Sequence, residues 1–536
     1  MPRNVRIASI GTALLLAACG SESPSPSPSA SSAQSAAPSA PAPTPDLSAY
    51  EGLWADATAE TIGTTAEYTN RVELGDINGD GLPDILFANG GDYDGPSPDG
   101  PVASRVFINR GPGQPFIETP QVMAGITGYT RVIKVRDLNN DGYNDILLGN
   151  TWQTQSQLLL NNGEGYTNAT AQLPQVNLNV GDLDVGDVDA DGDLDLVLVD
   201  WAAGSPFESG GGPVHLWLND GAAQFTEATA AQMPTTLIGF SWDLELVDVD
   251  NDWDLDLAVS AKVSDTSYLF ENDGAGSFTD VTGDALPHFA NNYEFEPMDL
   301  NGDGYLDLVT INDGDNVTGN GGQEHVFANN GDGTFSDMTE SWWPDAANPS
   351  EDDNAEIFLD VDSDGDADFL LFSLTGVDRL LVNDGTGRLS LVTTAIDAAA
   401  SRGSLGLAVA DLDGDGRLDI VESQGEVVGS FDERVYLATE AMAPDTAAPH
   451  IWTDLATDAS GTVTVHARVT DGLSPYVAGH PATVWLTWDG GDDAAGVLSW
   501  YGEYLFRITA DVPAGATGLA ICAADQSGNE ACTEAN

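Results

Sequence analysis

A nine-residue acidic pattern, D-x-[DN]-x-D-x-x-x-D, occurs seven times in this chain of 536 residues. Each copy is followed directly by an apolar run, such as residues 85–87 after the first. A hard cation of the size of calcium takes about six to eight oxygen ligands, which a tight loop supplies from alternate side chains and a backbone carbonyl. The copies begin at Asp76, Asp137, Asp187, Asp248, Asp299, Asp360 and Asp411. The pattern therefore predicts up to seven calcium sites.

Five positions of each loop are predicted to bind the ion: the side chains at positions 1, 3, 5 and 9 and the backbone carbonyl at position 7. These residues are Asp76, Asn78, Asp80, Leu82 and Asp84 in the first loop, Asp137, Asn139, Asp141, Tyr143 and Asp145 in the second, Asp187, Asp189, Asp191, Asp193 and Asp195 in the third, Asp248, Asp250, Asp252, Asp254 and Asp256 in the fourth, Asp299, Asn301, Asp303, Tyr305 and Asp307 in the fifth, Asp360, Asp362, Asp364, Asp366 and Asp368 in the sixth, and Asp411, Asp413, Asp415, Arg417 and Asp419 in the seventh. Glycine suits position 6 because it takes a positive φ without steric cost. Trp253 occupies that position in the fourth loop, so we expect a strained turn and a poor calcium site there.

An EF-hand, a magnesium site and a simple turn each fit the acidic pattern less well. An EF-hand begins similarly but closes with a glutamate at position 12 between two helices, whereas Val/Ile/Leu-rich runs flank these loops. Magnesium demands a rigid octahedron and keeps several water ligands. Asp, Asn and Gly also gather in turns for backbone reasons alone, but seven copies in one phase disfavour that origin.

The metal loops belong to a longer repeat. Their spacings are 61, 50, 61, 51, 61 and 51 residues, a period typical of propellers and repeat arrays. Between them lies a second repeated element of the form N-[DN]-G-x-G-x-F, as in LFENDGAGSFTDVT at residues 269–282. Two short β-patterned runs around an Asn/Asp-Gly turn predict a hairpin. Each repeat therefore predicts four strands.

The last repeat lacks the second half of its hairpin, because residues 434–441 run directly into a linker. The segment from Trp54 to Thr58 fits the missing pattern. We therefore expect it to supply the outer strand of the seventh blade, which closes the ring and leaves only short edges. The predicted fold is all-β, with a seven-bladed β-propeller over residues 47–440.

These repeats resemble the FG-GAP/VCBS repeats that build the β-propeller of integrin α-chains. The resemblance rests on the metal loop and the hairpin motif, and it covers roughly residues 47–440. It implies that each calcium loop joins the first and second strands of a blade, and that ligands bind on the opposite face. The family includes adhesion proteins, scaffolds and some enzymes, so the resemblance implies fold and metal rather than one function.

Long loops alternate with short ones between the second and third predicted strands. The long ones run over residues 89–104, 200–214, 311–324 and 422–433, on the face opposite the calcium loops. Loops on a rigid scaffold often carry function, and carboxylates mixed with aromatics suit sugars, cationic groups or further calcium. The candidate ligand residues are Asp92, Tyr93, Asp94, Trp201, Phe207, Asp313, Asp315 and Phe431. The alternative is that these loops are tolerated surface insertions.

Residues 1–19 look like a bacterial lipoprotein signal peptide. An apolar stretch at residues 7–16, too short to span a bilayer, leads into LAAC at residues 16–19, which resembles a lipobox and implies lipidation of Cys19. The next residue is not Asp, which implies the outer membrane. Residues 20–46 are almost wholly Ser, Pro and Ala and predict a disordered linker. We expect an anchored protein that faces the periplasm or the cell exterior.

The formal net charge is −70, and Lys134 and Lys262 are the only lysines. Nucleic acid and anionic lipid surfaces are bound by clustered Lys and Arg, which this chain lacks. The sequence therefore excludes nucleic acid as a partner and leaves the lipid anchor as the only membrane contact. A glycan, matrix component or protein remains as a ligand, and we expect a monomeric ectodomain.

Residues 447–536 predict a second domain. Alternating runs without helical periodicity favour a small β-sandwich, and the ending A-x-D-x-x-G-N-E resembles bacterial immunoglobulin-like modules. Cys522 and Cys532 lie ten residues apart around a predicted turn. In an oxidising compartment this spacing predicts a cross-strand disulfide, with two buried free thiols as the alternative.

Three functions fit these features. The first is a calcium-binding surface protein that mediates adhesion or binds a glycan or protein. The second is a propeller-based polysaccharide lyase or hydrolase, and the third is a passive envelope scaffold. The chain has no G-x-S-x-G or H-E-x-x-H motif and its six histidines are scattered, so no catalytic residue is assigned. Paired carboxylates for glycoside hydrolysis remain open. Binding is favoured over catalysis.

Overall fold

The computed structural model describes residues 46–65, 67–90, 95–96, 100–207, 209–262, 264, 266–312, 323–344, 346–374, 376–396, 403–425, 432–457, 462–475, 483–489, 496–513 and 516–535. The predicted signal sequence, Cys19 and the linker up to residue 45 lie outside these residues. Within the described part, no helix has the length and apolar character that membrane crossing requires. Most of the regular structure is β-strand, which confirms the predicted all-β class.

Seven four-stranded antiparallel sheets occur between residues 54 and 438 of the described chain. In chain order of their metal loops, they consist of β2 (Thr69–Gly75), β3 (Asp84–Asn89), β4 (Arg105–Ile108) and β5 (Ile117–Glu118); β6 (Thr130–Arg136), β7 (Asp145–Asn150), β9 (Gln157–Asn161) and β10 (Tyr166–Asn168); β12 (Val180–Gly186), β13 (Asp195–Asp200), β14 (Val214–Leu218) and β15 (Thr226–Glu227); β16 (Leu244–Val247), β17 (Asp256–Val259), β18 (Tyr268–Glu271) and β19 (Thr279–Asp280); β20 (Asn292–Met298), β21 (Asp307–Asn312), β22 (His325–Asn329) and β23 (Phe335–Asp337); β24 (Asp353–Leu359), β25 (Asp368–Ser373), β26 (Arg379–Val382) and β27 (Ser390–Val392); and β28 (Ser404–Ala410), β29 (Asp419–Gln424), β30 (Arg434–Ala438) and β1 (Trp54–Asp56).

Short helices follow the outer strands of several sheets, one short helix precedes β1, and one small extra sheet pairs two loops. These elements are η1 (Leu47–Tyr50), α1 (Thr58–Thr61), η2 (Thr170–Gln172), α2 (Thr229–Gln232), α3 (Thr282–Ala285), α4 (Thr339–Trp342), and the pair β8 (Thr154–Gln155) and β11 (Asn177–Leu178).

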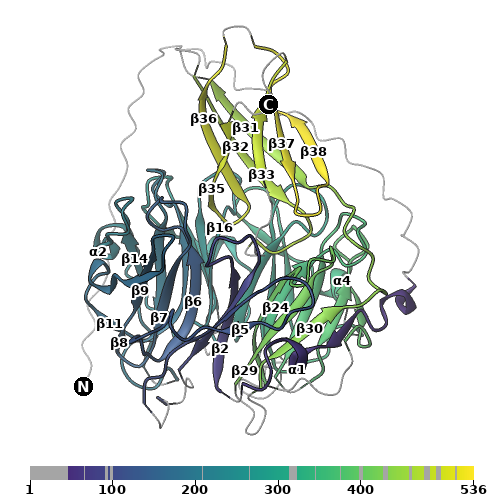
Figure 1. Cartoon of the computed structure of the whole chain (residues 1–536). Coiled ribbons are helices and arrows are strands. Elements are labelled where there is room, and N and C mark those ends of the chain that lie inside the picture. Colours follow the sequence, from purple (N-terminus) through teal and green to yellow (C-terminus); the bar gives the residue numbers. More distant parts are fainter. Residues whose placement is uncertain are drawn as a thin grey trace, which may run out of the picture. The chain divides into compact units, whose positions relative to one another are not determined.

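The seven sheets form a closed cycle. Their first strands, β2, β6, β12, β16, β20, β24 and β28, contact one another in this order, and β28 contacts β2. Figure 1 shows one such pair of neighbours, β2 and β6, in the lower part of the molecule. Apolar clusters fill the spaces between neighbouring sheets; one of them joins Leu86 of β3 to Ile146 of β7. The arrangement is consistent with the blades of a propeller.

A strand from the N-terminal end closes the cycle, as predicted. β1 pairs antiparallel with β30, with Trp54 opposite Ala438. Trp54 is buried. The hydroxyl of Thr58 accepts a hydrogen bond from the N–H of Val435 at 3.0 Å. Equivalent threonines in three other sheets accept the same bond from the third strand of their sheet. In Figure 1 the purple α1 lies beside the green β30. The hairpin pattern is thus completed by residues almost 400 positions away.

An asparagine in six of the seven hairpins ties its sheet to the preceding one. The backbone N–H of Asn329 donates to Asp307 of its own metal loop at 2.9 Å, and its Nδ2 donates to the carbonyl of Val249 in the preceding loop at 2.8 Å. The same two bonds are made by Asn109, Asn161, Asn219, Asn272 and Asn383. Six of the seven sheets are therefore linked to a neighbour in one repeated way.

The seventh sheet is the exception. Its equivalent residue, Ala438, keeps the backbone bond to Asp419 at 2.7 Å but has no side chain for the second bond. The N-terminal segment supplies a different link there, because the hydroxyl of Tyr50 donates to Asp362 of the sixth loop. Closure by the N-terminal segment therefore replaces the missing asparagine.

Two further four-stranded sheets follow the cycle (Figure 1, yellow). They consist of β31 (His450–Thr457), β32 (Thr462–Thr470), β36 (Leu505–Asp511) and β35 (Ser499–Gly502), and of β34 (Gly496–Val497), β33 (Thr483–Thr487), β37 (Ala520–Ala524) and β38 (Glu530–Glu534). They share a core that includes Val465 and Ile521. Cys522 and Cys532 are cross-strand partners joined by a disulfide, which confirms the predicted pairing. We call residues 447–536 the C-terminal domain.

Replacing Asn329 by alanine is expected to lower the free energy of unfolding by about 1–3 kcal/mol, because buried carbonyl groups lose their donor. Asn329 is 5% exposed, and its Nδ2 also donates to Leu306 at 3.1 Å. The matched control is Asn330→Ala, since Asn330 is exposed. Chemical denaturation in excess calcium measures both. Equal effects of the two substitutions would contradict the proposed link between sheets.

Candidate metal centres

Each metal loop turns around the carboxylate of its first aspartate. In the first loop the N–H groups of Gly79 and Gly81 donate to Asp76 at 2.7 and 2.8 Å, and both glycines have a positive φ. The aspartate at position 5 stabilises the second half of the turn, as Asp80 accepts the N–H of Leu82 at 3.0 Å. All seven loops make this second bond. Asp and Gly thus fold the chain back toward the first carboxylate.

The ninth aspartate of each loop begins the second strand of its sheet. It is at most 1% exposed in every loop. In the first loop Asp84 accepts the N–H of Ile77 at 3.1 Å and that of Asn109 at 2.8 Å. Both bonds recur in all seven sheets. The ninth aspartate therefore joins the metal loop to the hairpin.

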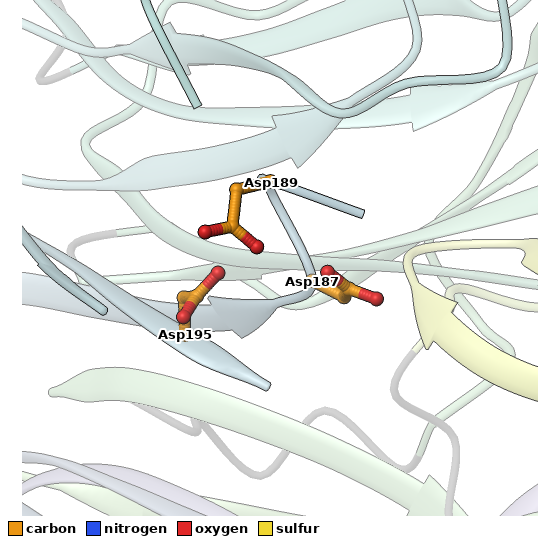
Figure 2. Close-up of side chains that lie close together, drawn as sticks. All are labelled: Asp187, Asp189 and Asp195. Atoms are coloured by element: carbon orange, nitrogen blue, oxygen red, sulfur yellow. The ribbon is translucent and has the colours of Figure 1, made fainter. Parts of the chain in front are cut away.

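Positions 1, 3 and 9 bring three carboxylates together in four of the loops. In each group one oxygen of every residue lies within 4.8 Å of the others. These groups are Asp187, Asp189 and Asp195; Asp248, Asp250 and Asp256; Asp360, Asp362 and Asp368; and Asp411, Asp413 and Asp419. Figure 2 shows the first of them, with the three carboxylates around a common space. All four could hold a metal ion.

The remaining loops have asparagine at position 3, namely Asn78, Asn139 and Asn301. Their first and ninth aspartates are placed as in the other loops, since the ninth makes the same two bonds. An amide oxygen is also a calcium ligand. The carboxylate at position 5 and the carbonyl at position 7 stay predicted ligands, because the carboxylate groups described above contain only positions 1, 3 and 9.

The loop carboxylates need a counter-charge. Burial, and then the neighbouring carboxylates of its own loop, raise the pKa of Asp84 to about 7 and that of Asp195 to about 8. Four buried loop oxygens have no hydrogen-bond partner among the described residues: one Oδ1 each of Asp248, Asp254, Asp366 and Asp413. Oxygen atoms without donors, gathered with excess negative charge, fit a divalent cation. The residues present therefore suit calcium.

The fourth loop has the strained turn that the sequence predicted, and contacts with the C-terminal domain explain it. Trp253 has a φ of +74°, which is strained for a residue other than glycine. Its ring stacks on His466 of the C-terminal domain at 6.2 Å between centroids, and its carbonyl accepts the hydroxyl of Tyr501 at 2.9 Å. Tryptophan at this position thus serves as a contact for the C-terminal domain. The loop still gathers a carboxylate triad, so poor calcium binding there stays a prediction.

The C-terminal domain contacts several metal loops through charged groups that the sequence did not single out. Arg468 is 2% exposed and donates to Asp248 and to the carbonyl of Gly304, both at 2.8 Å. Arg507 pairs with Asp187. Both aspartates are first residues of their loops. Position 1 of the third and fourth loops therefore belongs to a predicted metal site and to a domain contact.

Uncharged contacts extend this interface to the inner strands. The hydroxyl of Tyr504 donates to the carbonyl of Pro297 in β20 at 2.9 Å. Ser474 and Phe358 of β24 exchange two hydrogen bonds, at 2.8 and 3.2 Å. Because these contacts lie where the inner strands lead into the metal loops, the C-terminal domain packs on the metal-loop side of the sheets.

A fifth carboxylate triad, missed from the sequence, consists of Asp445, Asp471 and Asp525. Asp445 lies in the linker and the other two lie in turns of the C-terminal domain, beside a cavity of about 270 Å³ that Asp360 and Asp411 also line. The three residues have no common spacing or motif. Only the fold brings them together, so no sequence signal could have found them.

Few of the predicted ligand residues on the opposite face are placed by the structure. Asp92, Tyr93, Asp94, Asp313, Asp315 and Phe431 lie outside the described residues. Trp201 is 1% exposed and packs on Phe240 and Trp242, so it supports its loop from within and is not a surface contact. Phe207 is 42% exposed, with its ring edge against Phe240 at 4.8 Å. Phe207 alone among the described candidates is accessible.

His215 lies at the base of the same long loop but does not suit general-base chemistry. Its ring is within 3.9 Å of Asp200 and 3.7 Å of Glu227. Burial lowers its pKa, but the interactions with these two carboxylates outweigh burial and raise it to about 9. A histidine that stays protonated at neutral pH is a structural cation.

Comparisons with known proteins agree with the repeat pattern. Four stretches of the chain, residues 76–148, 137–198, 248–310 and 360–422, match the FG-GAP-like repeat family. These matches identify FG-GAP-like repeats in the chain. No curated protein sequence matches it.

Solved structures similar to this chain include the biofilm matrix protein Bap1 of V. cholerae, with 13% identity, a TM-score of 0.33, and coverage of 90% of this chain and 75% of that one. A protein from Lactobacillus plantarum has 14% identity and a TM-score of 0.38, with coverage of 63% of this chain and 86% of that one.

Removing calcium with a chelator is expected to destabilise the chain strongly. An ion that binds only the folded state adds about 2.7 kcal/mol per site at a hundredfold excess over its Kd. Thermal unfolding in calcium, in magnesium alone and in chelator measures the effect, with the lowest midpoint expected in chelator. Asp368→Asn should reduce the calcium effect, while Asp337→Asn, at the exposed end of β23, should not. A midpoint that chelator leaves unmoved would defeat the metal assignment.

Arg468→Gln is expected to loosen the C-terminal domain, because it leaves Asp248 buried without its guanidinium partner. Breaking a buried pair of this kind costs about 3–5 kcal/mol. Hydrogen exchange of residues 248–256 and 499–507 should accelerate. Arg388→Gln is the matched control, since Arg388 is exposed. Unchanged exchange in both segments would show that the pair does not hold the domains together.

Proposed function

We propose that this chain is a calcium-binding, lipid-anchored cell-surface protein. In the proposal, its seven sheets are the blades of a β-propeller, its C-terminal domain is an immunoglobulin-like sandwich, and it binds a glycan or protein ligand in adhesion. The ligand would bind on the face opposite the metal loops. One observation carries the choice of face: the C-terminal domain packs against the metal-loop side through Arg468, Arg507 and Tyr504.

The bases of the long loops on the opposite face are firmly held, which favours a binding role. The loops of the first and seventh sheets are joined by Thr69, whose hydroxyl accepts from Asn89 at 2.6 Å and donates to Glu433. The N–H of Glu433 in turn donates to Thr65 at 3.0 Å. Loops that a rigid scaffold holds at their bases are suited to ligand recognition.

An apolar contact is available on the same face. Phe207 is 42% and Leu237 57% exposed, on two segments that are paired through a bridge between Gly212 and Ile238. The ring of Phe207 rests on Phe240, so it is held in place although it is exposed. A fixed aromatic ring among polar groups suits a sugar or an aromatic protein contact.

The lipid anchor is the second part of the proposal. It rests on LAAC at residues 16–19, with Cys19 as the acylated residue, and on the Ser/Pro/Ala-rich segment behind it. A polyproline-like linker of this composition would extend the folded part away from the outer membrane by about 3.1 Å per residue.

The function is tested with the calcium-loaded full chain on a glycan array, run beside a polysaccharide-degradation assay. The proposal expects binding in calcium, loss of binding in chelator and no product release. Product release would replace it with a polysaccharide lyase or hydrolase. If neither assay gives a signal, and the chain also binds no member of a panel of surface proteins, the result would favour a passive scaffold.

Phe207→Ala is expected to weaken binding of the ligand so identified about tenfold, since truncating an anchored aromatic contact typically costs more than about 1 kcal/mol. Tyr143→Ala is the matched control: Tyr143 is equally exposed, at 42%, but lies in a metal loop and keeps its backbone carbonyl on substitution. Affinities are measured by titration calorimetry in calcium. Equal losses, or a larger loss with Tyr143→Ala, would place the ligand on the metal-loop side.

A further inference from the structure

A buried glutamate in β24 stands where the other inner strands have apolar residues. Glu356 lies four residues before its metal loop. The residues at this position in the other six inner strands are Val72, Ile133, Leu183, Leu244, Phe295 and Leu407. Burying a carboxylate at an apolar position of a repeat costs free energy, so its presence calls for a compensating interaction.

The alternation of side chains shows which way Glu356 points. Ile357 and Ala355 pack into the apolar cluster that contains Val409 and Ile420 of the next sheet. Glu356 has the opposite parity, so it points toward β20 of the preceding sheet. β20 and β24 are in contact.

Two glutamates of β20 face Glu356 from the other side. Glu294 and Glu296 stand five and three residues before their metal loop, as Ala355 and Ile357 do before theirs. Ala355 and Ile357 face the following sheet, so Glu294 and Glu296 point in the same way toward β24. Burial, and then the charges of Glu294 and Glu296, raise the pKa of Glu356 well above its usual value, which agrees with this placement. We call these three glutamates the β20–β24 carboxylate group.

The positive charge near this group acts on the two glutamates of β20: Arg71 and Arg131 act on Glu294, and Lys134 and Arg71 act on Glu296. The main influences on Glu356 are burial and other carboxylates. Arg71 pairs with Glu294 and also lies 3.4 Å from Asp243, so its charge is shared between two carboxylates. Glu296 has the hydroxyl of Ser474 as a hydrogen-bond donor. Glu356 is 7% exposed, and neither of its Oε atoms has a hydrogen-bond partner among the described residues. Its carboxylate is thus buried, uncompensated and directed at two others.

We propose that the β20–β24 carboxylate group binds a divalent cation, with calcium as the natural candidate, at a site separate from the seven metal loops. All the available ligands are hard carboxylate and hydroxyl oxygens, which suit such an ion. These glutamates are less closely gathered than the five aspartate triads, so the bound ion keeps some water ligands. Because the site lies among buried inner strands, its ion exchanges more slowly than those of the loops.

The test counts ions that leave slowly. The calcium-loaded full chain is transferred to calcium-free buffer, and the metal content is followed in time by elemental analysis. The wild type is expected to retain one slowly leaving ion per chain, and Glu356→Gln to lose it. Glu340→Gln, on an exposed helix, should retain it. A wild type without a slowly leaving ion, or a Glu356→Gln variant that keeps it, would overturn the proposal.

A second variant keeps the test decisive if Glu356→Gln folds poorly. Glu356→Leu introduces the residue found at this position in three other inner strands. It is expected to lack the slowly leaving ion and to unfold at a higher temperature than the wild type in chelator, because a buried charge is replaced by an apolar side chain. Retention of the ion by this variant would also overturn the proposal, and neither result depends on which ligand the opposite face binds.

Discussion

The carboxylate of the ninth aspartate in each metal loop is the group on which the repeated structure depends. It accepts one N–H from its own loop and one from the hairpin, and it begins the second strand. The hairpin residue that it holds then donates to the preceding sheet. One buried carboxylate thus fixes the loop, the strand register and the position of the neighbouring sheet. A charged group with both oxygens engaged in this way gives a geometry that a neutral side chain could not supply.

This role links metal binding to the integrity of the whole cycle. The ninth aspartates are buried beside other carboxylates, which raises the pKa of Asp84, Asp195 and their equivalents. A cation in the loop would remove the repulsion that burial makes costly, and it would keep these groups ionised and able to accept both hydrogen bonds. Calcium would therefore act on the contacts between sheets as well as on the loops. Ions bound in these loops would stabilise one closed structure, since each sheet is bonded to the one before it.

Local sequence determined most of the cycle, and distant contacts determined the rest. The loop and hairpin patterns predicted the sheets because each is formed by residues close together in the chain. The closing strand could also be predicted, since Trp54 to Thr58 repeats a pattern seen in the other hairpins. The cross-strand disulfide followed from short spacing. By contrast, the positions of Arg468 and Arg507 relative to the loops depend on how one domain packs on another. A single arginine within a strand pattern does not indicate such a contact between domains.

The same limit explains Trp253, which from sequence alone indicates only a defect in a metal loop. Its strained φ is compensated by the stack on His466 and the bond from Tyr501, contacts made more than 200 residues away. The C-terminal domain contacts the third and fourth metal loops for an electrostatic reason. The third, fourth and sixth loops each contain five aspartates, while the first, second and fifth contain an asparagine and fewer aspartates. With calcium bound, a five-aspartate loop would keep three negative charges, and a guanidinium paired with its first aspartate neutralises one of them. Arg468 and Arg507 meet the fourth and third loops, two of the three in which the ion alone leaves the largest excess of charge. The C-terminal domain and bound calcium would therefore complement one another as sources of positive charge for the most acidic part of the fold.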